Sequence, residues 1–129
     1  MKIEILKNNY CLTLEDLHYN YNWEDRVIKA WFYFNGGSIP RLFWSICHPL
    51  LQPYLKAFAV HDFHYSKKCK YSITRLESDE KLLFDLSLYH KLFWLISYIL
   101  VRLFWSSNFR KDLPFDKKLK TININTLNN

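Results

Sequence analysis

Glycine is almost absent from this chain: its 129 residues contain two, Gly36 and Gly37, side by side after Asn35. A chain of average composition would carry roughly nine glycines over this length. Glycine adopts left-handed backbone conformations that side chains disfavour. The pair therefore predicts a tight loop of special backbone shape at residues 35–37, the first candidate for a functional segment.

A disulfide framework, a signal peptide and a membrane-spanning run are also lacking. Cys11, Cys47 and Cys69 are odd in number and contain no CxxC pair, which indicates folding in a reducing compartment. The first residues lack the apolar run and cleavage site of a signal peptide. The longest apolar run, 92–101, is shorter than the roughly 20 residues that span a bilayer. We expect cytoplasmic synthesis, with any delivery elsewhere by a non-classical route.

Aromatic side chains and positive charge are abundant instead. Half of the residues are hydrophobic, 19% are aromatic and the formal net charge is +6. Residues 110–129 contain five basic and two acidic residues, and so carry half of the net charge. This balance favours an acidic surface, either a phosphate backbone or anionic lipid headgroups, without choosing between them. We expect the partner to be an anionic phospholipid surface. No specific nucleic acid is expected, because tail charges without a base-stacking motif give only sequence-blind attachment. The pattern identifies no protein partner, substrate or oligomeric state.

The N-terminal part is predicted to form strands. Apolar and polar residues alternate, with many aromatic and β-branched types, over 10–14, 17–21 and 27–34, and residues 22–25 are typical of a turn. The length allows one hydrophobic core but not two. We therefore assign residues 1–109 to a single globular domain and 110–129 to a basic, polar tail that frays.

The remainder is predicted to be helical. Pro40 and Pro53 suit the first turn of a helix, and Thr74 with Glu77 matches a capping box. The predicted helices cover residues 40–46, 53–65, 74–89 and 91–105. The expected fold class is α+β and mainly α, with a small N-terminal antiparallel sheet followed by a three- to four-helix unit.

The residues best suited to chemistry lie on the second predicted helix. His61 and Tyr65 share one face, because they are one turn apart. Asp62 points about 100° away from His61, so the two are expected to have separate roles. His61 suits a general base and Asp62 a ligand for a hard cation. We expect Asp79, on the next helix of an antiparallel pair, to hydrogen-bond His61 in a partly open cleft with Tyr65 nearby.

Simpler interpretations stay open. A histidine on a half-apolar helix is often structural, and Asp62 then serves only as a hydrogen-bond partner. His61 and His64 could bind zinc with Cys47 or His48, although their spacing fits no known zinc motif. The lysine-rich segment 67–70 is predicted to be a solvated loop. Three aromatic residues of the apolar C-terminal helix suit either the core or a membrane belt: Trp94, Tyr98 and Trp105.

The order of these motifs resembles an uncharacterised domain family that is frequent in phage and prophage genomes. The likeness rests on Gly36-Gly37-Ser-Ile-Pro, His61-Asp62-x-x-Tyr65, Arg75-x-x-x-Asp79 and Val101-Arg102, and covers roughly residues 10–106. That family carries no function that could be transferred.

The same skeleton is more distantly similar to the short prokaryotic phospholipases A2. In those enzymes a glycine loop and the Asp after the His hold calcium, the His takes a proton from water, and an Asp on a second helix orients the His. The resemblance implies an antiparallel helix pair of that kind. It implies calcium ligands at Asn35, Gly36, Gly37 and Asp62. It also implies a catalytic set of His61 as base, Asp79 as its orienter and Tyr65 as support for Asp79.

Two departures from those enzymes affect the expected activity. Asn35 replaces an Asp, which should weaken calcium binding, and Gly37 and Phe58 stand where those enzymes carry a disulfide pair. The implied function is a calcium-assisted phospholipid esterase. The alternative is a non-enzymatic binding or structural protein, derived from a phage or prophage, on the same scaffold.

Overall fold

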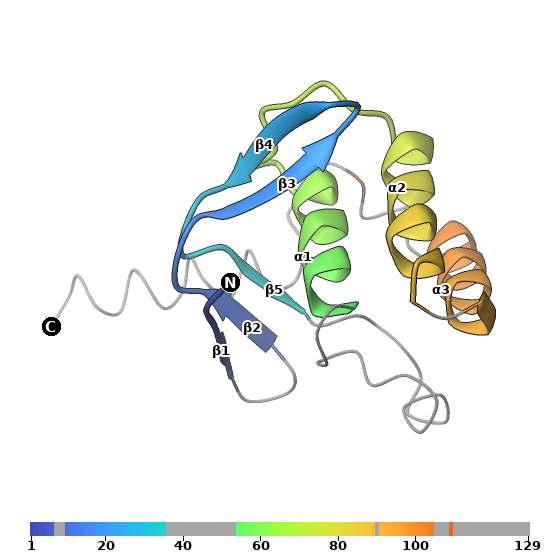
Figure 1. Ribbon diagram of the computed structural model, residues 1–129, viewed down its shortest axis with the longest axis horizontal. Helices are drawn as coiled ribbons and strands as arrows, with labels where there is room; N and C mark the ends of the chain where they lie inside the picture. Colours follow the sequence, from blue (N-terminus) through green and yellow to red (C-terminus); the bar gives the residue numbers. More distant parts are fainter. Residues whose placement is uncertain (7–9, 36–53, 90, 105–108, 110–129) are drawn as a thin grey trace, which may run out of the picture.

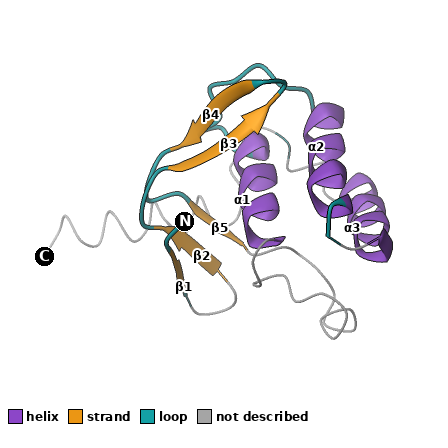
Figure 2. Cartoon of the chain, in the orientation of Figure 1, coloured by secondary structure: helices purple, strands orange, loops and turns teal. Residues whose placement is uncertain are grey.

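The computed structural model describes residues 1–6, 10–35, 54–89, 91–104 and 109. Figures 1 and 2 show α1 in the middle of the molecule, with strands on one side and the other two helices beyond it. The predicted α+β class is confirmed, while the helix predicted over 40–46 lies outside the described residues. The elements in chain order are β1 (Ile3–Ile5), β2 (Tyr10–Thr13), β3 (Leu17–Tyr21), β4 (Glu24–Ile28), β5 (Tyr33–Asn35), α1 (Tyr54–Tyr65), α2 (Arg75–Ser87) and α3 (Lys91–Phe104).

The described strands form two antiparallel sheets where a single small sheet was expected. One has the order β1-β2-β5 and the other pairs β3 with β4. The strand predicted over 27–34 is interrupted, because the chain leaves β4 at Ile28 and enters β5 at Tyr33. Trp31, between them, has a φ of 67° and donates its backbone N–H to the Thr13 carbonyl at 2.7 Å. This left-handed residue redirects the chain from one sheet to the other.

The β3–β4 hairpin closes through two residues of positive φ. Asn22 and Trp23 have φ values of 49° and 66°, the pattern of a type I′ turn, so the turn is shorter than predicted. Asparagine tolerates this conformation, whereas for a bulky side chain it costs on the order of 1–3 kcal/mol. The Trp23 side chain is 97% exposed and recovers none of that cost by burial.

Helix α1 is buried on nearly all sides. Ten of its twelve residues are buried. Leu55, Ala59 and Phe63 pack with strand residues in the main core, whereas Phe58 packs with Leu82 of α2. The two histidines and the aspartate of α1 are therefore enclosed by protein, inside the fold, whereas Lys56 is exposed.

Helices α1 and α2 form the predicted antiparallel pair. The ring of Tyr54, at the start of α1, packs edge-to-face on that of Tyr89 just past α2, and Tyr65, at the end of α1, contacts Asp79. The predicted capping box is also confirmed: Thr74 Oγ1 accepts the Glu77 N–H at 3.2 Å, and Glu77 Oε2 accepts the Thr74 N–H at 2.7 Å. In the described part of the chain, no helix has the length and apolar character needed to cross a membrane.

Candidate functional site

His61 lies between two carboxylates. Its Nε2 is 3.0 Å from Asp79 Oδ1, which confirms the predicted contact between the two helices. Its Nδ1 is 3.8 Å from Asp62 Oδ1. The expectation that Asp62 would point well away from His61 is therefore wrong, since the side-chain torsions bring the two tips together even though their Cα–Cβ bonds diverge. The partly open cleft is also wrong: the side chain of His61 is 3% exposed, because α1 is covered on both sides.

Asp79 is the point where the three helices meet. Its Oδ1 accepts the Tyr65 hydroxyl at 2.6 Å in addition to the contact with His61. Its Oδ2 accepts Arg102 Nη1 at 3.0 Å and lies 3.8 Å from Arg75 Nε. Burial alone would raise the pKa of Asp79, but the contacts with His61, Tyr65 and Arg102 outweigh it and lower that pKa. Asp79 is therefore an ionised carboxylate inside the protein.

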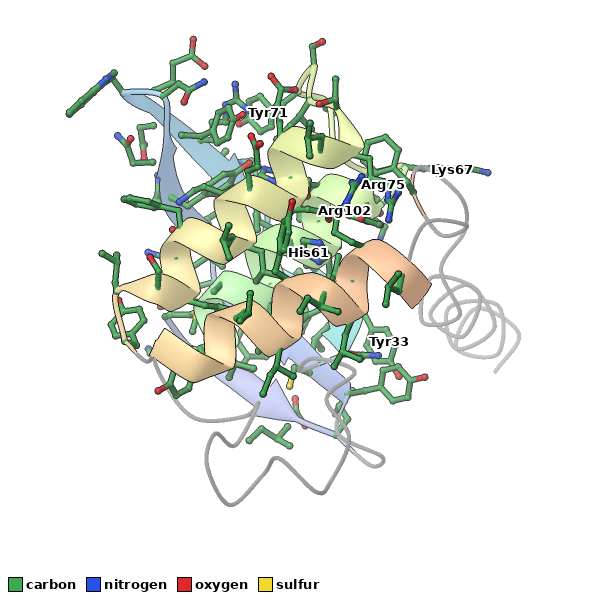
Figure 3. All side chains as sticks on the ribbon, turned by 90° about the vertical axis from the view of Figure 1, so that its right-hand side faces the viewer. Tyr33, His61, Lys67, Tyr71, Arg75 and Arg102 are labelled. Carbon is green, nitrogen blue, oxygen red and sulfur yellow. The ribbon has the colours of Figure 1, made fainter. Side chains whose placement is uncertain are left out.

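Arg75 and Arg102 complete a cluster with three predicted residues, although neither arginine was among the predicted site residues. The other members of the cluster are His61, Tyr65 and Asp79. Arg75 Nε donates to the Tyr65 hydroxyl at 3.2 Å, and Arg75 Nη2 donates to the Arg102 carbonyl at 2.7 Å. In Figure 3, where α2 and α3 face the viewer, His61 and Arg102 are seen between these helices with Arg75 to one side. The four-residue spacing of Arg75 and Asp79 on a helix was the available signal for Arg75.

The carboxylates control the protonation of the site. Burial lowers the pKa of His61, but Asp62 and Asp79 outweigh burial and raise it above its ordinary value. Burial and the neighbouring Asp79 raise the pKa of Tyr65, which therefore stays a neutral phenol and a hydrogen-bond donor. The arrangement suits an imidazole that gains a proton readily and is held in one orientation by a buried anion.

The charge of Asp62 acts on a residue of the three-stranded sheet. Burial and the charge of Asp62 together raise the pKa of Cys11, on β2, to about 11. Asn35 is the last residue of β5 and lies opposite Tyr10 on β2. Asn35 therefore belongs to the sheet that carries Cys11. The other two predicted calcium ligands, Gly36 and Gly37, lie outside the described residues.

The described residues do not make up a complete metal shell. Among them, no three His, Cys, Asp or Glu side chains gather as a metal cluster, and calcium takes about six to eight oxygen ligands. The zinc alternative is not supported for His64, whose Nε2 lies 2.9 Å from the Tyr19 hydroxyl in the core. The other zinc candidates, Cys47 and His48, lie outside the described residues.

The family model described as "Protein of unknown function (DUF1353)" matches residues 12–91. The match runs from the second half of β2 to the first residue of α3 and ends before Arg102. It therefore includes five residues of the site: His61, Asp62, Tyr65, Arg75 and Asp79. It is shorter than the likeness expected over 10–106. No curated protein and no solved structure matches the chain. Since the matched segment is more than half of the sequence, the chain belongs to this family of domains of unknown function.

Proposed function

We propose that the cluster around His61 hydrolyses a carboxylic ester of a phospholipid, with His61 as general base. The observation that carries this proposal is the pairing of His61 with Asp79 at 3.0 Å, where Asp79 is itself held by Tyr65 and Arg102. An oriented imidazole beside an ionised carboxylate is the arrangement that general-base catalysis requires. The similarity of the motifs to phospholipases A2 and the phage or prophage origin are parts of this proposal.

The tautomer follows from the contacts. Nε2 donates its hydrogen to Asp79, so Nδ1 is the nitrogen that would take the proton from the attacking water. That water would lie on the side of His61 that faces Asp62. The side chains of Arg75 and Arg102 are partly exposed at the outer end of the cluster, although both also contact Asp79 Oδ2.

Calcium is the proposed electrophile. Asp62, Asn35 and the backbone of Gly36 and Gly37 would hold it, and when bound it would stabilise the negative charge that develops on the carbonyl oxygen of the ester. Its support is the buried carboxylate of Asp62 beside His61, together with the motif resemblance. Asn35 in place of a carboxylate predicts weak binding.

The test is hydrolysis of mixed anionic phospholipid vesicles, and of a short-chain phospholipid in solution, with millimolar calcium. His61→Gln keeps an N–H donor for Asp79 but removes the base, so the rate should fall by about 10²–10⁴-fold. The matched control is His18→Gln: His18 pairs with Asp25 at 2.9 Å on the exposed hairpin, and its loss should leave the rate unchanged. Asp62→Asn should abolish the calcium dependence. A wild-type protein that cleaves neither substrate with calcium present would end the enzyme proposal.

A non-enzymatic binding or structural role is the second candidate, and one observation favours it. Asp79 is fully buried and its contacts join all three helices, which is also how a structural ion network is built. On this alternative the wild-type protein would hydrolyse neither substrate, and His61→Gln would change only the melting temperature. Because both candidates allow His61 to stabilise the fold, the hydrolysis rate is the measurement that separates them.

A further inference from the structure

A cavity lies between α1, β4 and the loop before α2. Its volume is about 400 Å³, which is within the range of small-molecule sites. Phe63 of α1, the β4–β5 connection and the loop before α2 enclose it. Neither His61 nor Asp79 lines it, so its chemistry is separate from that of the cluster. The residues that matter most for its chemistry are Trp31, Phe32, Phe63, Lys68, Lys70 and Tyr71.

The walls of this cavity are aromatic and held in place. Phe63 packs edge-to-face on Phe32 and on Tyr71, with ring centroids 5.7 and 6.2 Å apart. The Tyr71 hydroxyl accepts the backbone N–H of Val27 at 3.0 Å, which fixes that ring against β4. Walls of this kind present ring faces and edges in a fixed arrangement, which suits a flat unsaturated ring.

Trp31 lines the cavity and has a backbone conformation that is unfavourable for tryptophan. It combines a φ of 67° with a side chain that is 64% exposed, so neither its backbone nor burial explains its presence. The turn is pinned on both sides of it: Thr13 Oγ1 accepts the Phe32 N–H at 2.9 Å, and Asp16 Oδ1 accepts the Ala30 N–H at 2.8 Å. Strained residues held by their surroundings are concentrated at ligand sites.

Uncompensated positive charge lies at the same cavity. Lys29 is neutralised by Asp16 at 2.8 Å. Lys68 and Lys70, by contrast, form no ion pair with any residue that the structure describes, and Lys68 Nζ lies 5.9 Å above the centre of the Phe32 ring. Two cations beside aromatic rings are complementary to a ligand in which a negatively charged group is attached to a flat ring.

We propose that this cavity binds a nucleoside monophosphate, with the base against Trp31 and the phosphate between Lys68 and Lys70. The base supplies the flat ring that the aromatic walls accept, and the phosphate supplies the charge that the two lysines require. The volume suits one nucleotide, either free or at the phosphorylated end of a strand.

The proposal is tested by calorimetric titration of the whole chain with AMP, adenosine and inorganic phosphate. Adenosine lacks the phosphate of AMP, and inorganic phosphate lacks its base. AMP should bind more tightly than either. Trp31→Gly removes the ring while relieving the left-handed backbone, so affinity should fall at least tenfold with no loss of melting temperature. Trp23→Gly is the matched control, since Trp23 is also exposed with positive φ but does not line the cavity.

The charge contribution is tested by replacing both lysines. Lys68→Ala with Lys70→Ala should weaken AMP binding and reduce its salt dependence, whereas Lys67→Ala, outside the lining, should not. A 5′-phosphorylated oligonucleotide that binds more tightly than AMP would identify a strand end as the source of the ligand. The proposal is overturned if AMP gives no heat at millimolar concentration, or if the Trp31 and Trp23 variants bind AMP equally well.

Discussion

At the scale of single residues, Asp79 and His61 contribute to stability in opposite parts of the pH range. Asp79 has a lowered pKa, so its stabilising contribution is present above the ordinary carboxyl pKa and is lost as pH falls. His61 has a raised pKa, so its contribution is complete at acidic pH and is lost as pH rises through that raised value. The ion pair is therefore strongest between the two pKa values, where both groups are charged.

This opposition predicts that stability and activity change in opposite directions above neutral pH. As His61 loses its proton, the melting temperature should fall, while hydrolysis should rise because the neutral imidazole is the base. The midpoint of both changes should lie above the ordinary histidine pKa of about 6.5. Melting curves and rates between pH 5 and 9, for wild type and His61→Gln, check it. Retention of the same alkaline decline in the variant would contradict the role of His61.

Three of the five residues of this cluster could be predicted from the sequence for a clear reason. His61, Tyr65 and Asp79 follow from helical spacing on two neighbouring helices, which local rules describe well. Arg102 lies 23 residues beyond Asp79, and its contact depends on how α3 packs on α2. No local pattern contains that information, so the residue that closes the cluster from outside could not be assigned a place in it.

At the scale of elements, helices were easier to predict than strands. The boundaries of α2 follow from Thr74 and Glu77, whose side chains satisfy the first backbone groups of the helix. The break between β4 and β5 has no such signal, because Trp31 is a residue type that normally continues a strand. The turn at Trp31 is instead held by residues that are distant in the sequence: the Thr13 carbonyl accepts the Trp31 N–H, and Asp16 accepts the Ala30 N–H.

The cap of α2 should stabilise the helix that carries Asp79. Thr74→Ala removes the hydroxyl that accepts the Glu77 N–H and should lower the free energy of unfolding by about 1 kcal/mol. Denaturant titration measures the change. Glu80→Ala, on the exposed side of the same helix, changes α2 without touching the cap and should have a smaller effect. Equal losses in the two variants would show that the capping box adds no stability of its own.

At the scale of the whole molecule, charge is distributed unevenly along the chain. Residues 110–129 contribute half of the net charge of +6, while the cluster at Asp79 binds its charges internally. Attraction to an anionic surface is long-ranged and screened by salt. Binding to membranes is therefore expected to depend on the tail more than on the candidate site.

Removal of residues 110–129 should weaken binding to vesicles that contain anionic lipid by about tenfold or more, since each basic residue near such a surface contributes about 1 kcal/mol. Sedimentation with vesicles of increasing anionic content, at low and high salt, measures the effect. Neutral vesicles are the control and should bind both forms alike. Undiminished binding of the shortened chain to anionic vesicles would assign the attraction to the folded domain.

The enclosure of α1 has a consequence for synthesis on the ribosome. The strands emerge first, but their apolar faces have no cover until residues 54–65 follow. Those residues carry His61, which pairs with Asp79 as well as with Asp62, and Asp79 is in turn held by Arg102. A nascent chain that has exposed only the sheets and α1 therefore lacks the carboxylate and the arginine that complete the cluster. We expect native structure to form only once α3 has left the exit tunnel, so that the domain folds late and in one step.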